Sequence, residues 1–161
     1  MLHANTPLQI VRFKAVDYNL DELAKRLTTF KSLTTRTPTS VTVDQLRAID
    51  ESPTNVLLLQ VGKDDDEQLV VGMVHLAIIY LEDRVHLGPI CIDANSVPRG
   101  HGTPLMQAAI EYIKTNFVGL RRIDLSNRPS HDYTEWYKKF GFTPRTEEAG
   151  DPTTVFRLLL S

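Results

Sequence analysis

Apolar residues recur along the chain with two different periods, which predict a succession of strands and helices. Alternating or short continuous apolar runs are typical of strands, and apolar residues three and four positions apart are typical of amphipathic helices. The expected strands are Leu8–Ala15, Val56–Val61, Leu69–Leu81, Arg84–Asp93, Leu120–Ser126, Phe142–Pro144 and Val155–Leu160. The expected helices are Leu20–Phe30, a short one carrying Leu46 and Ile49, Thr103–Phe117 and Tyr133–Phe140. The order, β-α-α-β-β-β-α-β-α-β-β, predicts one sheet with helices on both faces, an α/β sandwich of three layers in a single domain over residues 1–161.

Residues at the ends of the helical patterns predict where the helices begin and end. Ser, Thr, Asp and Asn side chains cap helix N-termini, and glycine often follows helix C-termini. The expected N-caps are Asn19 with Glu22 in a near capping box, Thr42 or Asp44, Thr103 followed by Pro104 at the first helical position, and Ser130 or Asp132. The expected helix stops are Ser52–Pro53, Gly119 and Gly141.

Two residues within the strand patterns predict irregular pairing. Pro89 has no N–H to donate, so the strand Arg84–Asp93 should be bulged or unpaired at that position. Gly72 marks a point where the backbone of its strand bends. The acidic run Asp64–Glu67 lacks calcium-loop spacing and is interpreted as the charged tip of a hairpin.

Composition and charge narrow the class of protein. With 161 residues, 42% hydrophobic and 24% charged, the chain can bury one core, and neither disorder nor a second large domain is expected. A formal net charge of -2 gives no basic surface for nucleic acid. The single cysteine, Cys91, excludes an intramolecular disulfide and is interpreted as an inert core residue, and no apolar run approaches the roughly 18 residues that span a membrane. A soluble cytoplasmic protein with neither a nucleic-acid nor a membrane partner is expected.

The segment Leu87–Lys114 joins a strand, a glycine-containing loop and a helix. Its apolar triplet Ile90–Ile92 ends at Asp93, and the sequence RGHG at residues 99–102 leads directly into the helix. A helix N-terminus offers unpaired backbone N–H groups and the positive end of the helix dipole, so this loop is suited to hold phosphate. The alternative is an ordinary turn that contains two glycines.

Four motifs in this order resemble the GNAT acetyltransferase superfamily, and the likeness covers nearly the whole chain. The motifs are Ile90–Asp93, a hydrophobic triplet plus Asp that ends a strand; Arg99–Pro104, similar to an Arg-x-x-Gly-x-[Gly/Ala] loop; Arg121–Ser130, similar to a strand-to-helix turn of one bacterial branch; and Tyr137–Phe142, a Tyr-x-x-x-Gly-Phe motif. The resemblance implies a mixed, largely antiparallel sheet that splays between the strand ending near Asp93 and the strand Leu120–Ser126.

The same resemblance implies a site for acetyl-CoA as the acyl donor, with no metal. Pantetheine would lie in the splay as a pseudo-strand, and backbone N–H groups of the loop would bind pyrophosphate. The donor-binding residues that it implies are Ile90, Cys91, Ile92, Arg99, Gly100, His101, Gly102, Thr103 and Asn127, with Arg128 as an alternative source of charge. Tyr137 would protonate the leaving thiolate after direct attack by an amine, while a backbone N–H at the strand bulge polarises the carbonyl. The alternative for Tyr137 is a half-buried aromatic residue of the core.

The loop departs from the family pattern at Pro104. A Gly or Ala with an N–H stands there in the family, and the apolar pair Leu105–Met106 follows two residues early, which indicates a deletion at the start of the helix. A hydrogen bond to a charged oxygen is worth about 1.5–3 kcal/mol, so the missing amide should weaken CoA affinity about ten- to a hundredfold. His101 would offset part of this loss if it donates to phosphate; otherwise it is an exposed loop residue.

The chain also departs from the family pattern in lacking a carboxylate that could act as the general base. Many relatives carry Glu or Asp immediately before the hydrophobic triplet, where this chain has Gly88 and Pro89. The histidines of the strand patterns, His75 among them, are interpreted as surface or packed residues rather than metal ligands. The amine therefore either arrives neutral or is deprotonated by another group, for which the candidates are Glu82, Asp83 and His86.

The expected function is transfer of an acetyl group from acetyl-CoA to a primary amine of a small molecule or peptide. The alternatives are a catalytically weak or inactive GNAT domain that binds CoA or a protein partner, and a scaffold without CoA that dimerises through its hairpin. The acceptor would be selected by the two N-terminal helices and the loop Arg145–Pro152, whose acids Glu147, Glu148 and Asp151 either attract a cationic amine or are simply solvated. The sequence leaves monomer and homodimer open.

Overall fold

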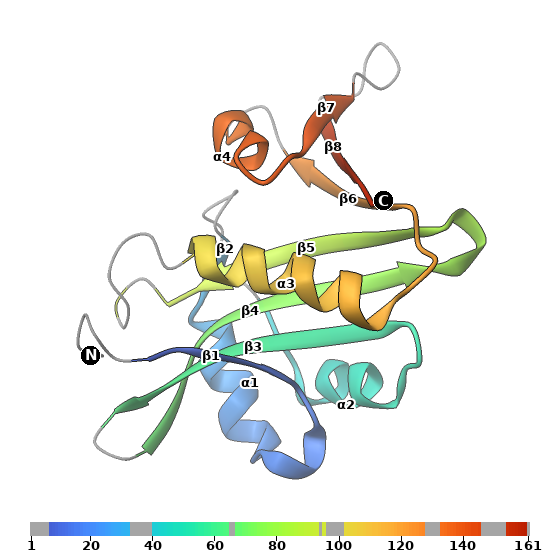
Figure 1. Cartoon of the computed structure of the whole chain (residues 1–161). Helices are drawn as coiled ribbons and strands as arrows, with labels where there is room; N and C mark the ends of the chain where they lie inside the picture. Colours follow the sequence, from blue (N-terminus) through green and yellow to red (C-terminus); the bar gives the residue numbers. More distant parts are fainter. Residues whose placement is uncertain are drawn as a thin grey trace.

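One mixed sheet forms the centre of the protein (Figure 1). The computed structural model describes residues 7–32, 40–64, 67–93, 95, 102–127, 133–145 and 154–160. Within them, eight strands are joined in the order β1-β3-β4-β5-β6-β8-β7, and β2 pairs with β5 off this path. The strands are β1 Gln9–Arg12, β2 Lys31–Ser32, β3 Asn55–Asp64, β4 Glu67–Ile79, β5 Arg84–Ile92, β6 Arg122–Asn127, β7 Thr143–Arg145 and β8 Thr154–Leu159. Neighbouring strands are antiparallel except for β5 and β6, which run parallel.

Helices cover both faces of this sheet, which confirms the predicted three-layer α/β/α sandwich (Figure 1). In the described part of the chain they are α1 Leu20–Thr28, α2 Val43–Glu51, α3 Gly102–Asn116 and α4 Thr134–Lys138, with 3-10 turns η1 Ala15–Asp17 and η2 Tyr80–Glu82. None of the helices in these ranges has the length and apolar character needed to cross a bilayer.

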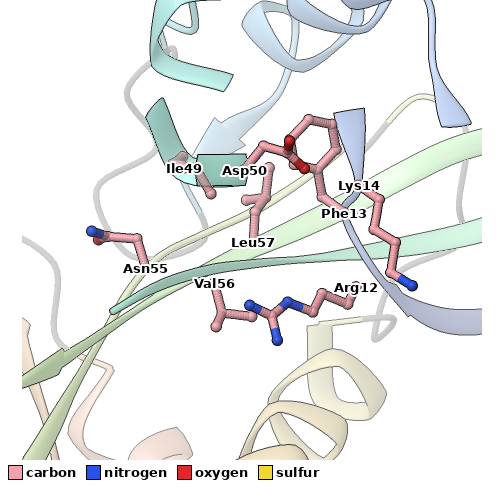
Figure 2. Close-up of a pocket in the computed structure, with 8 residues that line it drawn as sticks. All are labelled: Arg12, Phe13, Lys14, Ile49, Asp50, Asn55, Val56 and Leu57. Carbon is pink, nitrogen blue, oxygen red and sulfur yellow. The ribbon is translucent and has the colours of Figure 1, made fainter. Parts of the chain in front are cut away.

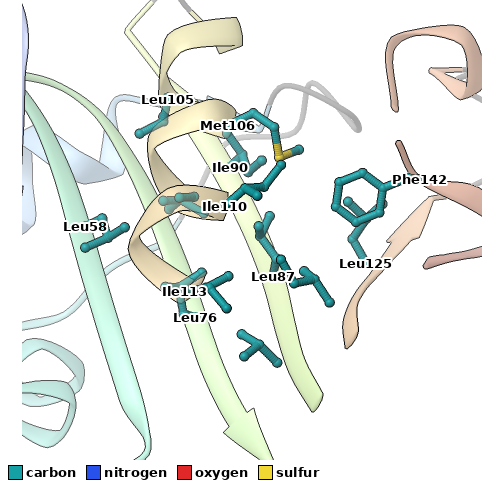
Figure 3. Close-up of a cluster of buried hydrophobic side chains, with 14 of the residues drawn as sticks. Leu58, Leu76, Leu87, Ile90, Leu105, Met106, Ile110, Ile113, Leu125 and Phe142 are labelled. Carbon is teal, nitrogen blue, oxygen red and sulfur yellow. The ribbon is translucent and has the colours of Figure 1, made fainter. Parts of the chain in front are cut away.

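The larger half of the core lies between the sheet and helices α3 and α4 (Figure 3). Alternate residues of β4 from Val74 onward point into it, as do those of β5 on each side of an interruption at Gly88 and Pro89, and α3 contributes one apolar stripe. The residues of that stripe are Leu105, Met106, Ala109, Ile110 and Ile113. Leu105 and Met106 are both 0% exposed, so the buried face of α3 starts directly after Pro104, as the sequence pattern predicted.

Helices α1 and α2 bury the opposite face of β3, β4 and β5. The amphipathic face of α1 places Leu23 and Leu27 against the sheet, and Leu46 does the same from α2. Cys91 of β5 is 0% exposed in this layer, which confirms its interpretation as a core residue.

Two of the predicted helix caps are confirmed. The Asn19 side chain accepts a hydrogen bond from the backbone N–H of Glu22 at 3.1 Å and starts α1. Thr42 and Gln45 form a reciprocal capping box ahead of α2, with bonds of 3.1 and 2.9 Å. These bonds satisfy N–H groups that a helix leaves unpaired in its first turn.

The predicted starts of the other two helices are wrong. Helix α3 begins at Gly102, so Thr103 and Pro104 are its second and third residues rather than its cap and first residue. The helix tolerates proline there because the first N–H groups have no acceptor within the helix. Helix α4 follows Tyr133, which makes no side-chain cap bond, and the predicted caps Ser130 and Asp132 lie outside the described residues.

The strand pairing contains the irregularities that the sequence predicted. Val74 pairs with Ile90 and Leu76 with Leu87, so Gly88 and Pro89 stand opposite a single residue and form a β-bulge. A second shift occurs where β3 pairs with β4 beside Gly72. Strand β2 was not predicted, because two residues are too short to show a period.

Replacing Gly72 by alanine should lower the free energy of unfolding by about 1–3 kcal/mol, the usual cost of overpacking a core. An added Cβ would lie 2.8 Å from Oε1 of the fully buried Gln60 and 3.2 Å from Cδ2 of Leu105. Urea denaturation of both proteins measures the difference. An unchanged midpoint and slope would contradict the close packing of α3 on this point of β4.

Candidate functional site

Strands β5 and β6 part after only three residue pairs. Their parallel pairing runs from Arg84 with Arg122 to His86 with Asp124, although β5 continues to Ile92. Strand β6 stays paired with β8 over its whole length, so its second half follows β8 away from β5 (Figure 1). The sheet is therefore splayed between these two strands, at the position that the family resemblance implied.

The bulge lies directly beyond the point where the strands part. His75 of β4 stands opposite Gly88 and Pro89, and its Nε2 lies 2.9 Å from Oδ1 of Asn55. Burial lowers the pKa of His75 and the neighbouring His86 lowers it further, while a hydrogen bond to the backbone of Gly88 opposes them. His75 thus connects the bulge of β5 to β4 and β3.

The backbone of the apolar triplet presents its groups to two different neighbours. The N–H of Asp93 donates to the carbonyl of Val71 at 2.9 Å, so Asp93 faces β4. Because backbone groups alternate in direction along a strand, Cys91 also faces β4, whereas Ile90 and Ile92 face the splay. Of the three residues predicted to bind pantetheine, two therefore direct backbone donors and acceptors toward the splay.

An ion pair anchors the end of β5. Asp93 is 6% exposed, and its Oδ2 lies 2.6 Å from Nη2 of Arg26 in α1. The other oxygen accepts the N–H of Asn95 at 3.1 Å, an Asx turn that starts the connection to α3. Arg26 also donates to the carbonyl of Val70 at 3.0 Å. From the sequence, Asp93 was expected only to end the strand, and its position directly after an apolar triplet was the available signal for a larger role.

The first turn of α3 is joined to α4. Gly102 is buried, and Oγ1 of Thr103 accepts a hydrogen bond from Nε1 of Trp136 at 3.3 Å. Pro104 is exposed. Other predicted residues, namely Arg99, Gly100, His101, Arg128, Glu147, Glu148 and Asp151, lie outside the described residues, and Asn127 is the last residue of β6.

Tyr137 lies in an aromatic cluster on the α3 side of the sheet. Its ring centroid is 4.9 Å from that of Phe156, 5.5 Å from Trp136 and 6.3 Å from Phe142. The side chain is 1% exposed, more deeply buried than the half-buried aromatic considered from the sequence. Gly141, at φ +96°, turns the chain so that Phe142 returns against Tyr137, which explains the spacing of the motif.

A polar cluster occupies the other face of the sheet where β5 and β6 part. Asp124 is 4% exposed, and Arg157 donates to its Oδ1 at 2.9 Å. Nε of Arg122 and Nη1 of Arg84 lie 3.3 and 3.8 Å from its Oδ2. This buried carboxylate was missed from the sequence, because charged residues in a strand pattern are normally exposed.

His86 is the candidate base closest to the splay. It belongs to the last β5–β6 pair, whereas Glu82 and Asp83 precede β5 and are exposed. Burial lowers the pKa of His86, Arg84 lowers it further, and Asp124 raises it. A partly buried imidazole with a lowered pKa is neutral near pH 7 and can accept a proton.

A cavity of about 200 Å³ lies elsewhere, between β1, α2 and the start of β3 (Figure 2). It contains none of the predicted site residues, and its acid, Asp50, already accepts the N–H of Ala15 at 2.8 Å. No group of three or more potential metal-binding side chains was found in the described ranges. The splay remains the candidate site.

A family model described as the acetyltransferase (GNAT) family matches residues 20–142. Among solved structures, the chain is similar to the PaiA N-acetyltransferase from Thermoplasma acidophilum in complex with coenzyme A, with 14% identity, a TM-score of 0.68, and coverage of 96% of this chain and 99% of that one. It is also similar to a GNAT-family acetyltransferase from Streptococcus pneumoniae, with 20% identity, a TM-score of 0.67, and coverage of 96% and 100%. A spermidine N-acetyltransferase from Vibrio cholerae in complex with CoA and spermine gives 16% identity, a TM-score of 0.65, and coverage of 94% and 95%. At these identities the structural matches show the fold, and a search of curated proteins gave no match.

Proposed function

The chain belongs to the GNAT acetyltransferase family, and from that premise we propose that it transfers an acetyl group from acetyl-CoA directly to a primary amine. The observation that carries the proposal is the parting of β5 and β6 beyond His86 and Asp124, next to a bulge in β5. The splay opens a strand edge to an extended ligand, and the bulge interrupts the regular ladder beside it.

The residues at the splay fit an acyl-CoA. Ile90 and Ile92 both direct backbone donors and acceptors to the splay side of β5, where β2 pairs with Ile92, and such groups suit the amides of pantetheine. The first turn of α3 provides N–H groups at Gly102 and Thr103 that have no acceptor within the helix, and such groups suit phosphate. We place Arg99, Gly100 and His101 of the preceding loop in the same role. When bound, acetyl-CoA supplies an acyl group activated as a thioester.

The bulge determines which backbone group can polarise the thioester carbonyl. Pro89 has no N–H, so Ile90 carries the first donor after the bulge that faces the splay. A donor fixed in this way stabilises the oxygen on which negative charge develops during attack by the amine. Tyr137 protonates the departing thiolate, and close aromatic packing holds its ring in place.

His86 accepts the proton of the attacking amine in this proposal. Its pKa lies below the ordinary value of 6.5, so activity should be constant near neutral pH and should fall as the pH drops through that lowered pKa. We expect His86→Gln to reduce kcat/KM about tenfold and to remove this acidic limb, because buffer can partly replace a base in a partly exposed site. The pH profile of kcat/KM measures both effects.

Asp83→Asn is the matched control for this prediction. Asp83 is exposed, precedes β5 and has a left-handed backbone at φ 51°, a conformation that asparagine tolerates. Its pH profile should match that of the unaltered protein. An unchanged acidic limb in His86→Gln would assign that limb to the substrate and leave the amine to arrive neutral.

The acceptor that we propose is a primary amine of a small molecule or peptide. We also propose a cytoplasmic location, which the single free cysteine supports. Release of free thiol from acetyl-CoA in the presence of an amine panel that includes spermine and peptides tests the activity. Amine-dependent release supports the proposal. CoA binding without release would support the alternative, an inactive GNAT domain that binds CoA, and absence of both would leave an interaction role.

A further inference from the structure

Strand β2 lies on the edge of β5 that the acyl donor needs. Lys31 pairs with Ile92 and Ser32 with Cys91. On the other edge of β5, Ile92 pairs with Gly72 of β4 and Cys91 pairs with Met73. Strand β2 therefore occupies the edge that faces the splay, beyond the point where β6 has left it.

The pairing of Lys31 with Ile92 uses specific backbone groups. Because Asp93 donates to β4, the N–H and C=O of Ile92 point away from β4, toward β2. Lys31 and Ile92 are therefore the hydrogen-bonded pair of this short ladder. A strand and a pantetheine chain cannot occupy these two groups at the same time.

We infer that β2 is a displaceable strand that competes with acyl-CoA for the edge of β5 at Ile92. The inference rests on the proposed function, since it takes the splay as the donor site. In the free protein, Lys31 holds the backbone groups of Ile92, and donor binding must break this pair. The observed affinity for CoA is then lower than the intrinsic affinity of the open edge, by the fraction of molecules in which the edge is free.

The structure keeps β2 beside this edge without a long ladder. Phe30, directly before β2, is 0% exposed in the core beneath α1. The guanidinium carbon of Arg26 lies 5.2 Å from its ring centroid, and the same Arg26 binds Asp93 at the end of β5. The chain is thus anchored up to Phe30, and in the described residues β2 pairs with β5 through Lys31 and Ser32 alone, so β2 can leave the edge while α1 stays in place.

Lys31→Pro tests the competition because proline removes the N–H that pairs with Ile92. We expect this variant to bind CoA about tenfold more tightly in a calorimetric titration, as the edge becomes free. Lys31→Ala is the matched control: it keeps the N–H and removes only the ammonium group, so its affinity should stay within about twofold of the unaltered protein. Equal or weaker binding by Lys31→Pro would overturn the inference.

Hydrogen exchange on the unaltered protein tests the same point without relying on the folding of a variant. Saturating CoA should speed exchange of the Lys31 amide, because this amide loses its partner. The Ile92 amide should stay protected, because the pantetheine chain replaces Lys31 as its hydrogen-bond partner. Continued protection of Lys31 in the complex would overturn the inference even if Lys31→Pro does not fold. Absence of CoA binding in the unaltered protein and in both variants would instead overturn the proposed function.

Discussion

Tyr137→Phe is expected to lower kcat for acetyl transfer about 100-fold or more, with little change in the KM for acetyl-CoA. General acid catalysis contributes about 10²–10⁴-fold, and the substitution removes only the hydroxyl. The ring remains packed against Phe142 and Phe156, so the fold should be retained. Steady-state thiol release gives kcat and KM, and a thermal melt verifies folding.

Tyr112→Phe provides the control for this loss. Tyr112 lies on α3, and its hydroxyl accepts a hydrogen bond from Arg12 at 3.3 Å, at the far edge of the sheet from the splay. Loss of that hydroxyl should leave kcat unchanged. Full activity in Tyr137→Phe would make Tyr137 a core aromatic residue and remove it from the mechanism.

Asp124→Ala is expected to reduce the free energy of unfolding by about 2–4 kcal/mol. Removal of one partner from a buried ion pair leaves uncompensated charge, which typically costs about 3–5 kcal/mol, and the partly exposed arginines reduce this value. Arg157 is 16% exposed in its side chain and Arg122 is 30% exposed, so both would keep some contact with water. Urea denaturation of the two proteins measures the difference.

Glu135→Ala is the matched control, since it removes an ion-paired carboxylate from the surface. The Glu135 side chain is 86% exposed, and its oxygen lies 3.5 Å from Nζ of Lys138. Exposed pairs contribute about 0–1 kcal/mol, so this variant should be nearly as stable as the unaltered protein. Equal effects of the two substitutions would contradict a stabilising contribution of the buried Asp124 ion pairs where β5 and β6 part.

The sequence predicted best what short segments determine by themselves. The apolar stripe of α3, the caps at Asn19 and Thr42 and the bulge at Pro89 each depend on a few neighbouring residues. Periodicity and turn chemistry therefore sufficed for the layers and the order of the main elements. The family resemblance added the position at which the sheet splays.

The features that the sequence did not reveal depend on contacts between distant segments. Strand β2 exists because Lys31 meets Ile92, and two residues show no period. Helix α3 begins at Gly102, two residues before the expected first position at Pro104, and the hydroxyl of the expected cap Thr103 instead binds Trp136 of α4. Several good capping residues in succession leave the exact start of a helix to its surroundings.

The polar part of the candidate site was also hidden. Asp124 and Arg157 are 33 positions apart, and Arg26 reaches Asp93 from another layer of the fold. Charged residues of this kind are usually solvated, so a sequence pattern does not distinguish those that a fold buries as pairs. In the structure, Asp124 lies at the last residue pair before β5 and β6 part, and Asp93 directly follows the end of β5.

A crystal structure of the protein with acetyl-CoA bound would decide whether the splay between β5 and β6 holds the acyl donor. We expect the pantetheine chain to lie between β5 and β6, with hydrogen bonds to the backbone of Ile90, and the phosphates of the cofactor to lie at the first turn of α3. Acetyl-CoA bound elsewhere, for example in the cavity beside Asp50, and absent from the edge of β5 would show that the splay is not the donor site.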